Sequence, residues 1–203
     1  MWDCTIVYVA LPLILAGVAA NLTEDSEAEA ANAKIDRLIE QLGDDHFAMR
    51  EAASRKLDAL GKPALPALRK AAASSADLEI RRRATQVVRA INARLGKKEL
   101  PKWQGTWMTE NGVYIKFSGD QFSSGTPTFG PASGTITIVE VGDKLTFADL
   151  LNEDGPLKGG QALAIFRRDG DTLHACWTYT TSRPTEFKYG GNNYCFTFRR
   201  VKK

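Results

Sequence analysis

The side chains that most often carry enzymatic chemistry are few and scattered in this sequence. The two histidines, His46 and His174, lie far apart, and the chain has no His/Cys cluster at the spacing of a zinc site. We expect His46 on a helix surface. His174 alternates with Leu173, Ala175 and Trp177, so it faces solvent if those three point inward. The chain also lacks a glycine-rich phosphate loop and a Gly-x-Ser-x-Gly elbow. The sequence therefore predicts no catalytic residue, no metal site and no cofactor.

Cysteine chemistry is the second candidate. Cys176 and Cys195 lie on two segments that should be antiparallel neighbours, and both alternate with inward residues, so they share the outer face. A disulfide between them is geometrically possible and suits an oxidising compartment. Two unpaired buried thiols are the alternative, and the sequence leaves both open.

A long loop between the segments that carry Cys176 and Cys195 holds the candidate binding residues. It contains Arg183, Glu186 and Phe187, and it follows Trp177, which belongs to the inward set. Loops above the mouth of a barrel often hold binding residues, so these four side chains are our candidates for ligand contact. In the alternative interpretation, Arg183 pairs with Glu186 to pin the loop, and Phe187 tucks into the end of the barrel.

The elements that must position these residues are short strands. Beyond Trp103, β-branched and aromatic residues alternate with polar ones, and Gly-Asp, Asp-Gly and Ser-Gly pairs separate the runs. Eight antiparallel strands in sequence order favour an up-and-down barrel, which holds packed side chains or one small ligand. We expect strands at Trp103–Thr109, Val113–Phe117, Gln121–Ser124, Gly134–Val141, Lys144–Leu150, Ala162–Arg168, Thr172–Thr178 and Tyr194–Val201.

Two groups of motifs carry a family resemblance. Trp103-Gln104-Gly105-Thr106-Trp107 resembles the opening strand of lipocalin-type barrels. The resemblance implies that Trp107 plugs the closed end and that Arg199 or Arg200 stacks on it. Further along, Asp154-Gly155-Pro156, Asp169-Gly170-Asp171-Thr172-Leu173 and Arg183-Pro184-Thr185-x-Phe187 are together similar to a planctomycete family of exported lipocalin-like domains. This family has no assigned activity, so the resemblance implies none for this chain.

Residues 33–95 change to the apolar period of helices. The cores Met49-Arg50-x-x-Ala53 and Ile80-Arg81-x-x-Ala84 recur 31 residues apart, which predicts two copies of one helical hairpin. These hairpins resemble HEAT repeats. Two repeats are few for a stable solenoid, so we expect cover from the other domain, a partner or a second copy. No aromatic residues are interleaved with Arg81-Arg82-Arg83, which favours a solvated face over a nucleic-acid site.

The N-terminal residues have the pattern of a targeting signal. Residues 6–20 form an unbroken apolar run that ends in small residues, the length of a signal-peptide core, although no Lys or Arg precedes it. We expect residues 1–20 to be a signal peptide, with a retained membrane anchor formed by residues 6–20 as the alternative. Residues 21–32 are acidic and lack periodicity, which predicts a disordered tether. Residues 96–102 contain a proline among polar residues, which predicts a linker.

Composition limits the function classes. The chain has 203 residues, 43% hydrophobic and 25% charged, with a net charge of +3, which is too small to indicate nucleic-acid binding. We expect an α+β chain with a short HEAT-like α-solenoid at 33–95 and an eight-stranded lipocalin-like β-barrel at 103–201. Its expected function is that of an exported, periplasmic or extracellular, non-catalytic module. The barrel would hold a small apolar ligand and the repeats would dock a protein. A structural envelope or self-association protein with a packed barrel is the alternative, and an uncharacterised hydrolase the third.

Overall fold

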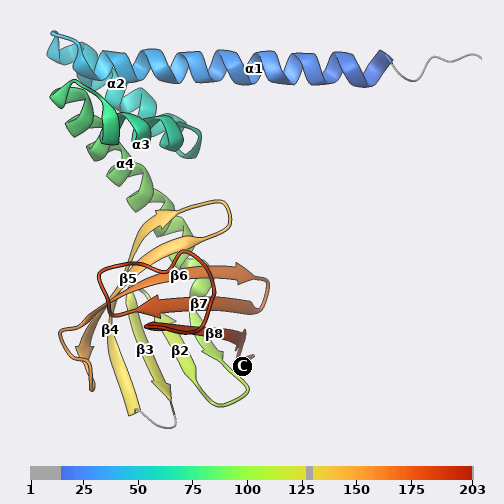
Figure 1. The fold of residues 1–203 in the computed structure, drawn as a ribbon, viewed down its shortest axis with the longest axis vertical. Helices are drawn as coiled ribbons and strands as arrows, with labels where there is room; N and C mark the ends of the chain where they lie inside the picture. Colours follow the sequence, from blue (N-terminus) through green and yellow to red (C-terminus); the bar gives the residue numbers. More distant parts are fainter. Residues whose placement is uncertain (1–14, 127–129, 203) are drawn as a thin grey trace, which may run out of the picture. The chain divides into compact units, whose positions relative to one another are not determined.

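The computed structural model describes residues 15–126 and 130–202, and side-chain burial from residue 27 onward. The chain divides into two compact units, Met1–Val87 and Val88–Lys203 (Figure 1). Most of the expected signal peptide lies outside the described residues. No helix in the described part is both long and apolar enough to cross a bilayer.

The first unit is helical. Its elements, together with the helix that continues into the second unit, are α1 (Leu15–Glu40), η1 (Gln41–Gly43), α2 (Phe47–Leu60), η2 (Lys62–Ala64), α3 (Leu65–Ser74) and α4 (Leu78–Glu99). Gly61 ends α2 with a φ of 71°, a conformation that glycine adopts without steric cost. Pro66 lies in the first turn of α3, where a missing N–H is tolerated.

The core of this unit consists of aliphatic side chains at helical spacing. Its members from α1 to α4 that belong to the first unit are Ile35, Leu38, Leu42, Ala53, Leu57, Ala64, Leu65, Leu68, Ala84 and Val87. All are largely removed from water, which provides the main stabilisation of a helical unit of this size.

The two expected hairpins contain the same pattern of side-chain hydrogen bonds to backbone carbonyls. Arg50 donates from Nη1 to the carbonyl oxygen of Asp44 at 2.7 Å, and Arg81 donates to that of Ser75 at 3.1 Å, each six residues upstream. Ser54 likewise bonds the carbonyl of Arg50, as Thr85 bonds that of Arg81. The repeated arginine thus holds the turn that precedes its own helix.

Two segments differ from expectation. The expected disordered tether, residues 21–32, is helical as part of α1. Its glutamates and alanines are strong helix formers, which outweighs the missing apolar period. The expected linker, residues 96–102, is also helical: α4 runs to Glu99 and η3 covers Leu100–Trp103. Gly96 is buried, and a Cβ there would lie 2.8 Å from Cβ of Ile138, so tertiary packing keeps this turn folded.

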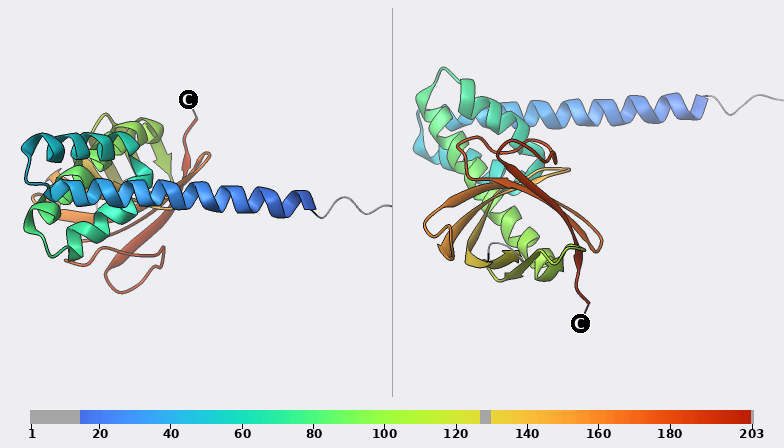
Figure 2. Two further views of the ribbon diagram at one scale, coloured as in Figure 1. Left: turned by 90° about the horizontal axis from the view of Figure 1, so that it is seen from above. Right: turned by 60° about the horizontal axis from the view of Figure 1, so that its bottom comes forward.

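The second unit contains a closed barrel of eight antiparallel strands in sequence order (Figures 1 and 2). The strands are β1 (Gly105–Met108), β2 (Tyr114–Ser118), β3 (Gln121–Thr126), β4 (Gly130–Val141), β5 (Thr146–Asp154), β6 (Gln161–Asp169), β7 (Thr172–Thr178) and β8 (Asn193–Arg200). β8 closes on β1 through the pairs Trp107–Arg200 and Met108–Arg199. The α+β class and the eight-stranded antiparallel barrel are confirmed.

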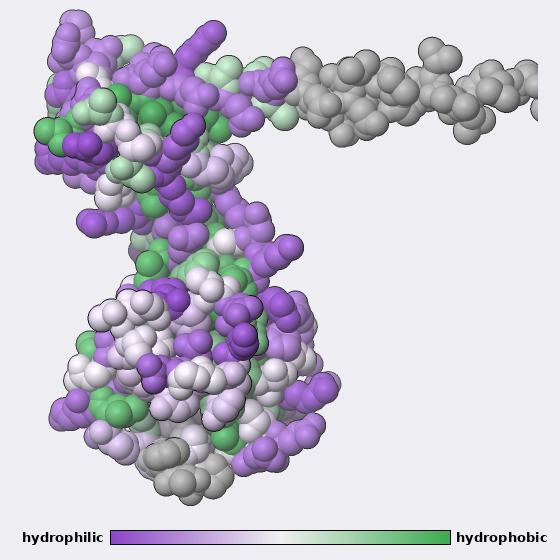
Figure 3. Space-filling model, viewed as in Figure 1, coloured by the Kyte–Doolittle hydropathy of each residue, from purple (hydrophilic) through white to green (hydrophobic). Residues whose placement is uncertain are grey.

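The alternation that predicted the strands also separates the side chains that face the interior of the barrel from those that face outward. Inner-face residues from every strand and Trp103 of η3 form one core. Its strand residues are Trp107, Ile115, Phe117, Phe122, Ile136, Ala148, Leu150, Ala162, Ala164, Phe166, Leu173, Ala175 and Phe198. On the face shown in Figure 3, the barrel surface is mostly hydrophilic or neutral, with small hydrophobic patches. The apolar side chains therefore lie mainly inside, as closure of a sheet requires.

Candidate ligand-binding mouth of the barrel

One end of the barrel is sealed by aromatic rings. Trp103, from η3, packs against Phe166 and Phe117 with ring centroids 4.8 and 5.8 Å apart. Trp107 is fully buried and donates from Nε1 to the carbonyl of Trp103 at 2.7 Å. The guanidinium of Arg200 lies 4.1 Å from the centroid of the Trp107 ring. This end is filled, so it leaves no room for a ligand.

Of the two arginines considered as the cap, only one is placed over the ring. Arg200 also donates to the carbonyls of Gln104 at 2.7 Å and Lys102 at 2.9 Å, which holds its guanidinium at the closed end. Arg199 is exposed. Its backbone pairs with Met108, so its side chain belongs to the opposite face of β8.

At the other end of the barrel, inner-face aromatic residues emerge toward solvent. Trp177 and Phe196 stack with centroids 5.1 Å apart and both are half-buried. Tyr194, two residues before Phe196 on β8, lies opposite Trp177 in the β7–β8 ladder and is 46% exposed. Tyr179 meets Tyr194 edge-on at 6.3 Å and is 39% exposed. We call these four residues the aromatic mouth.

Two polar groups border the aromatic mouth. Asn152, the inner-face residue near the end of β5, is almost completely buried, and its Nδ2 donates to the carbonyl of Gly160 at 2.9 Å. Burial raises the pKa of Tyr179 above the ordinary value, and a hydrogen bond with Asn152 partly opposes this rise. The Tyr179 hydroxyl is therefore neutral at physiological pH and available as a hydrogen-bonding group.

Beyond Tyr179, which belongs to the aromatic mouth, the long loop contacts the outer wall of the barrel through Arg183 and Phe187. We call residues 179–192, which connect β7 to β8, the strap (Figure 1). Arg183 donates from Nη1 to the carbonyls of Ala148 and Ala164, and from Nη2 to Asp149, whose side chain points outward from β5. The expectations that Arg183 reaches the mouth or pairs with Glu186 are not met, because three acceptors on β5 and β6 hold it.

Phe187 also lies outside the barrel. Its ring is 5.9 Å from the ring of His174 and 5.3 Å from the guanidinium carbon of Arg167, both on the outer faces of their strands. Glu186 is exposed on the strap. Of the four candidate binding residues, only Trp177 lies at the mouth, while Arg183, Glu186 and Phe187 belong to the strap.

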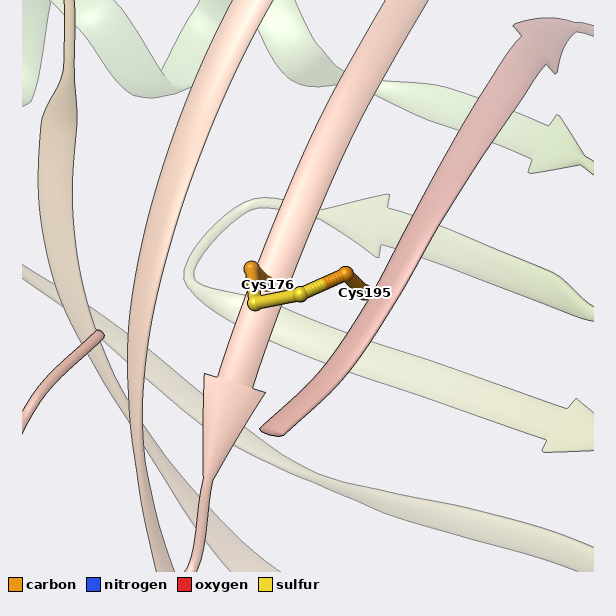
Figure 4. The surroundings of a disulfide bond; sticks show 2 residues. All are labelled: Cys176 and Cys195. Carbon is orange, nitrogen blue, oxygen red and sulfur yellow. A yellow bond between two sulfur atoms is a disulfide. The ribbon is translucent and has the colours of Figure 1, made fainter. Parts of the chain in front are cut away.

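The disulfide lies on the outer face of the β7–β8 pair. Cys176 and Cys195 are directly opposed in the β7–β8 ladder and are joined through their sulfurs (Figure 4). Cys176 and its neighbour Ile165 on β6 are fully buried although both face outward, and Pro184 of the strap is buried too. We infer that the strap covers an apolar strip of the outer wall that includes the disulfide.

The residues that sequence reasoning left out of its binding set are Tyr179, Tyr194, Phe196 and Asn152. Tyr194 and Phe196 flank Cys195, so the alternation that places Cys195 on the outer face points both of them inward, and continuing the alternation two positions beyond Trp177 would have found Tyr179. No sequence signal singles out Asn152. Within the described ranges, no three His, Cys, Asp or Glu side chains gather in a way that could hold a metal ion.

Comparison with known proteins adds no assignment. No protein-family model, curated protein or solved structure matches this chain.

Proposed function

We propose that this chain is an exported, non-catalytic binding module whose barrel takes a small ligand at its aromatic mouth and whose helical repeats dock a protein. The observation that carries the proposal is the contrast between the two ends of the barrel. Rings and Arg200 fill one end, while Trp177, Phe196, Tyr179 and Tyr194 remain partly open to solvent at the other. Partly exposed aromatic clusters with a few polar groups are typical of small-molecule sites.

The chemistry of the mouth indicates the kind of ligand. Its four aromatic side chains and Asn152 carry no formal charge at neutral pH, which favours a neutral molecule with a flat or apolar face. Tyr179 and Tyr194 offer hydroxyl groups that can orient such a molecule by hydrogen bonds. The aromatic packing of Trp103, Phe117 and Phe166 limits the depth to which a ligand can enter, so the ligand is expected to be small.

Export and family membership are parts of the same proposal. The Cys176–Cys195 disulfide supports export, because such bonds persist in oxidising compartments. The Trp107–Arg200 stack supports a lipocalin-like barrel, and the matching hydrogen bonds of Arg50 and Arg81 support HEAT-like repeats. A signal peptide at residues 1–20 completes this picture, with the retained anchor at 6–20 as its alternative.

A fluorescence titration tests ligand binding. The probe is N-phenyl-1-naphthylamine, a neutral molecule whose emission rises in apolar sites. We expect saturable binding that Tyr194→Ala weakens roughly tenfold, in line with the energy of one aromatic contact. Tyr189→Ala, at a 74% exposed position of the strap, is the matched control and should bind like the parent. Absence of saturable binding, or equal binding by both variants, would contradict the proposal.

A structural protein with a packed barrel is the second candidate. The aromatic packing of the closed end favours it, and a chain that binds no probe would support it. The third candidate is a hydrolase at the mouth, which would lose its turnover on Arg183→Ala or Glu186→Ala. The bonds of Arg183 to β5 and β6 lend this candidate no support.

A further inference from the structure

The helical unit contains a groove lined by both apolar and basic side chains. It has a volume of about 770 Å³ and lies between α1 and the C-terminal part of α2. Alanines and leucines form much of its lining, and three cations, Lys34, Arg37 and Lys56, stand along it, with no carboxylate among its lining residues. Within the described residues, none of these three cations has an ion-pair partner.

The face of α1 that lines the groove continues toward the N-terminus and changes sign. Lys34, Arg37 and Gln41 line the groove, and Ala30 and Glu27 follow upstream at alternating spacings of three and four residues. At about 100° per residue, these five positions fall within a sector of roughly 80°. One continuous face thus carries an acid at one end, a small residue in the middle and two cations at the other end.

This part of α1 has no cover within its own unit. Every residue from Glu27 to Lys34 is exposed, and in Figures 1 and 2 the N-terminal part of α1 extends beyond α2 and α3. A helix without a packed face is marginally stable in water, so such a stretch gains most from a partner helix.

We propose that two copies of this chain pair through antiparallel α1 helices, with Glu27 of each copy set against the basic groove of the other. A two-fold axis between Ala30 and Ala31 places Lys34 opposite Glu27 of the second copy. It also sets Arg37 at the level of position 24, another glutamate in the sequence. The alanines at the centre allow the two backbones to approach closely.

Charge complementarity selects a second copy in antiparallel orientation. In a parallel pair, Glu27 would meet Glu27 and Lys34 would meet Lys34, which is unfavourable. The antiparallel pair satisfies both charges on both copies with one self-complementary patch, as an isologous interface requires. The inference rests on the protein-docking half of the proposed function and is independent of ligand binding at the barrel mouth.

Charge reversal in the full-length chain tests the pairing. Sedimentation velocity over a hundredfold range of concentration measures the dimer dissociation constant. Glu27→Lys alone and Lys34→Glu alone should each weaken the dimer roughly tenfold, because two attractive pairs become repulsive. The double reversal should restore the parent affinity. Glu29→Lys, which changes the opposite side of α1, is the matched control and should leave the dimer unchanged.

A crosslink tests the position of the axis. In a Cys4→Ser background, Ala30→Cys should give a disulfide-linked dimer on mild oxidation, mapped to position 30 by peptide mass spectrometry. A chain that stays monomeric overturns the proposal. So does a dimer that ignores the single reversals, as association through the apolar residues 6–20 would, or one that the double reversal fails to restore. Probe binding at the barrel is measured separately, so either proposal can fail while the other stands.

Discussion

The guanidinium of Arg200 joins three segments at the closed end of the barrel: the Trp107 ring, the carbonyls of Lys102 and Gln104, and Asp171 at 3.5 Å. We expect Arg200→Ala to lower the free energy of unfolding of the barrel by about 2–3 kcal/mol, through loss of a cation–π contact and of charged hydrogen bonds. Arg199→Ala should change it by less than about 0.5 kcal/mol. Denaturant unfolding followed by tryptophan fluorescence measures both, and equal losses would contradict this role.

The ionisation of Tyr179 should make the stability of the barrel depend on pH. Because burial raises its pKa in the folded state, the unfolded chain releases this proton first as the pH rises. Its contribution to stability is therefore present below the ordinary tyrosine pKa of about 10 and declines above it. Tyr179→Phe should flatten the loss of stability above that pH, as measured by denaturant unfolding at several pH values. A parent and variant that lose stability in parallel would count against a buried Tyr179 hydroxyl.

At the scale of the element, the disulfide stabilises the β7–β8 hairpin. The two cysteines are 19 residues apart, and a crosslink that closes a loop of this length stabilises by about 3 kcal/mol in the chain-entropy model. Reductant should lower the free energy of unfolding by about 2–4 kcal/mol. It should have no effect on the Cys176→Ser/Cys195→Ser double variant, whereas Cys4→Ser should respond like the parent. A parent that is insensitive to reductant would show that the bond does not form.

The guanidinium of Arg183 anchors the strap to β5 and β6. Without Arg183, its bonds to Ala148, Ala164 and Asp149 are lost, so the strap should open more often. We expect Arg183→Ala to speed tryptic cleavage after Lys188 several-fold in the native protein. Glu186→Ala, at an exposed position of the same loop, should leave that rate unchanged, and an unchanged rate for Arg183→Ala would refute the anchoring role.

Local patterns predicted the elements better than their contacts. Alternation and the Asp169-Gly170 turn located the strands of the barrel to within a few residues. The strap was misplaced because no local pattern shows that Asp149, 34 residues earlier, would bind Arg183 on the outer wall. The turn at Gly96 was read as a linker because its packing against Ile138 depends on tertiary structure. The mouth was found only in part, since Asn152 becomes an inner-wall residue of the site through closure of the sheet.

At the scale of the whole molecule, the two units differ in the hydrophobic core that each one contains. The core of the barrel unit is contained between Leu100 and Phe198 and includes three tryptophans. The helical unit buries mainly leucine, isoleucine and alanine from about 60 residues, and helical units of that size are marginal alone. The stabilities of the two units should therefore differ, with the helical unit the weaker.

Unfolding of the full chain in denaturant should show this difference as two transitions. Among the described residues, Trp103, Trp107 and Trp177 all belong to the barrel, so tryptophan fluorescence reports mainly on that unit, while the circular dichroism signal at 222 nm is dominated by the helices. We expect the dichroism to decay at lower denaturant than the fluorescence. Trp2→Phe, which removes the N-terminal tryptophan, should leave the later transition in place.

If dimerisation through α1 stabilises the helices, raising the protein concentration should move the earlier transition toward the later one, because only the paired state is favoured by mass action. Coincident transitions at every concentration would show instead that the helices and the barrel unfold as one cooperative body.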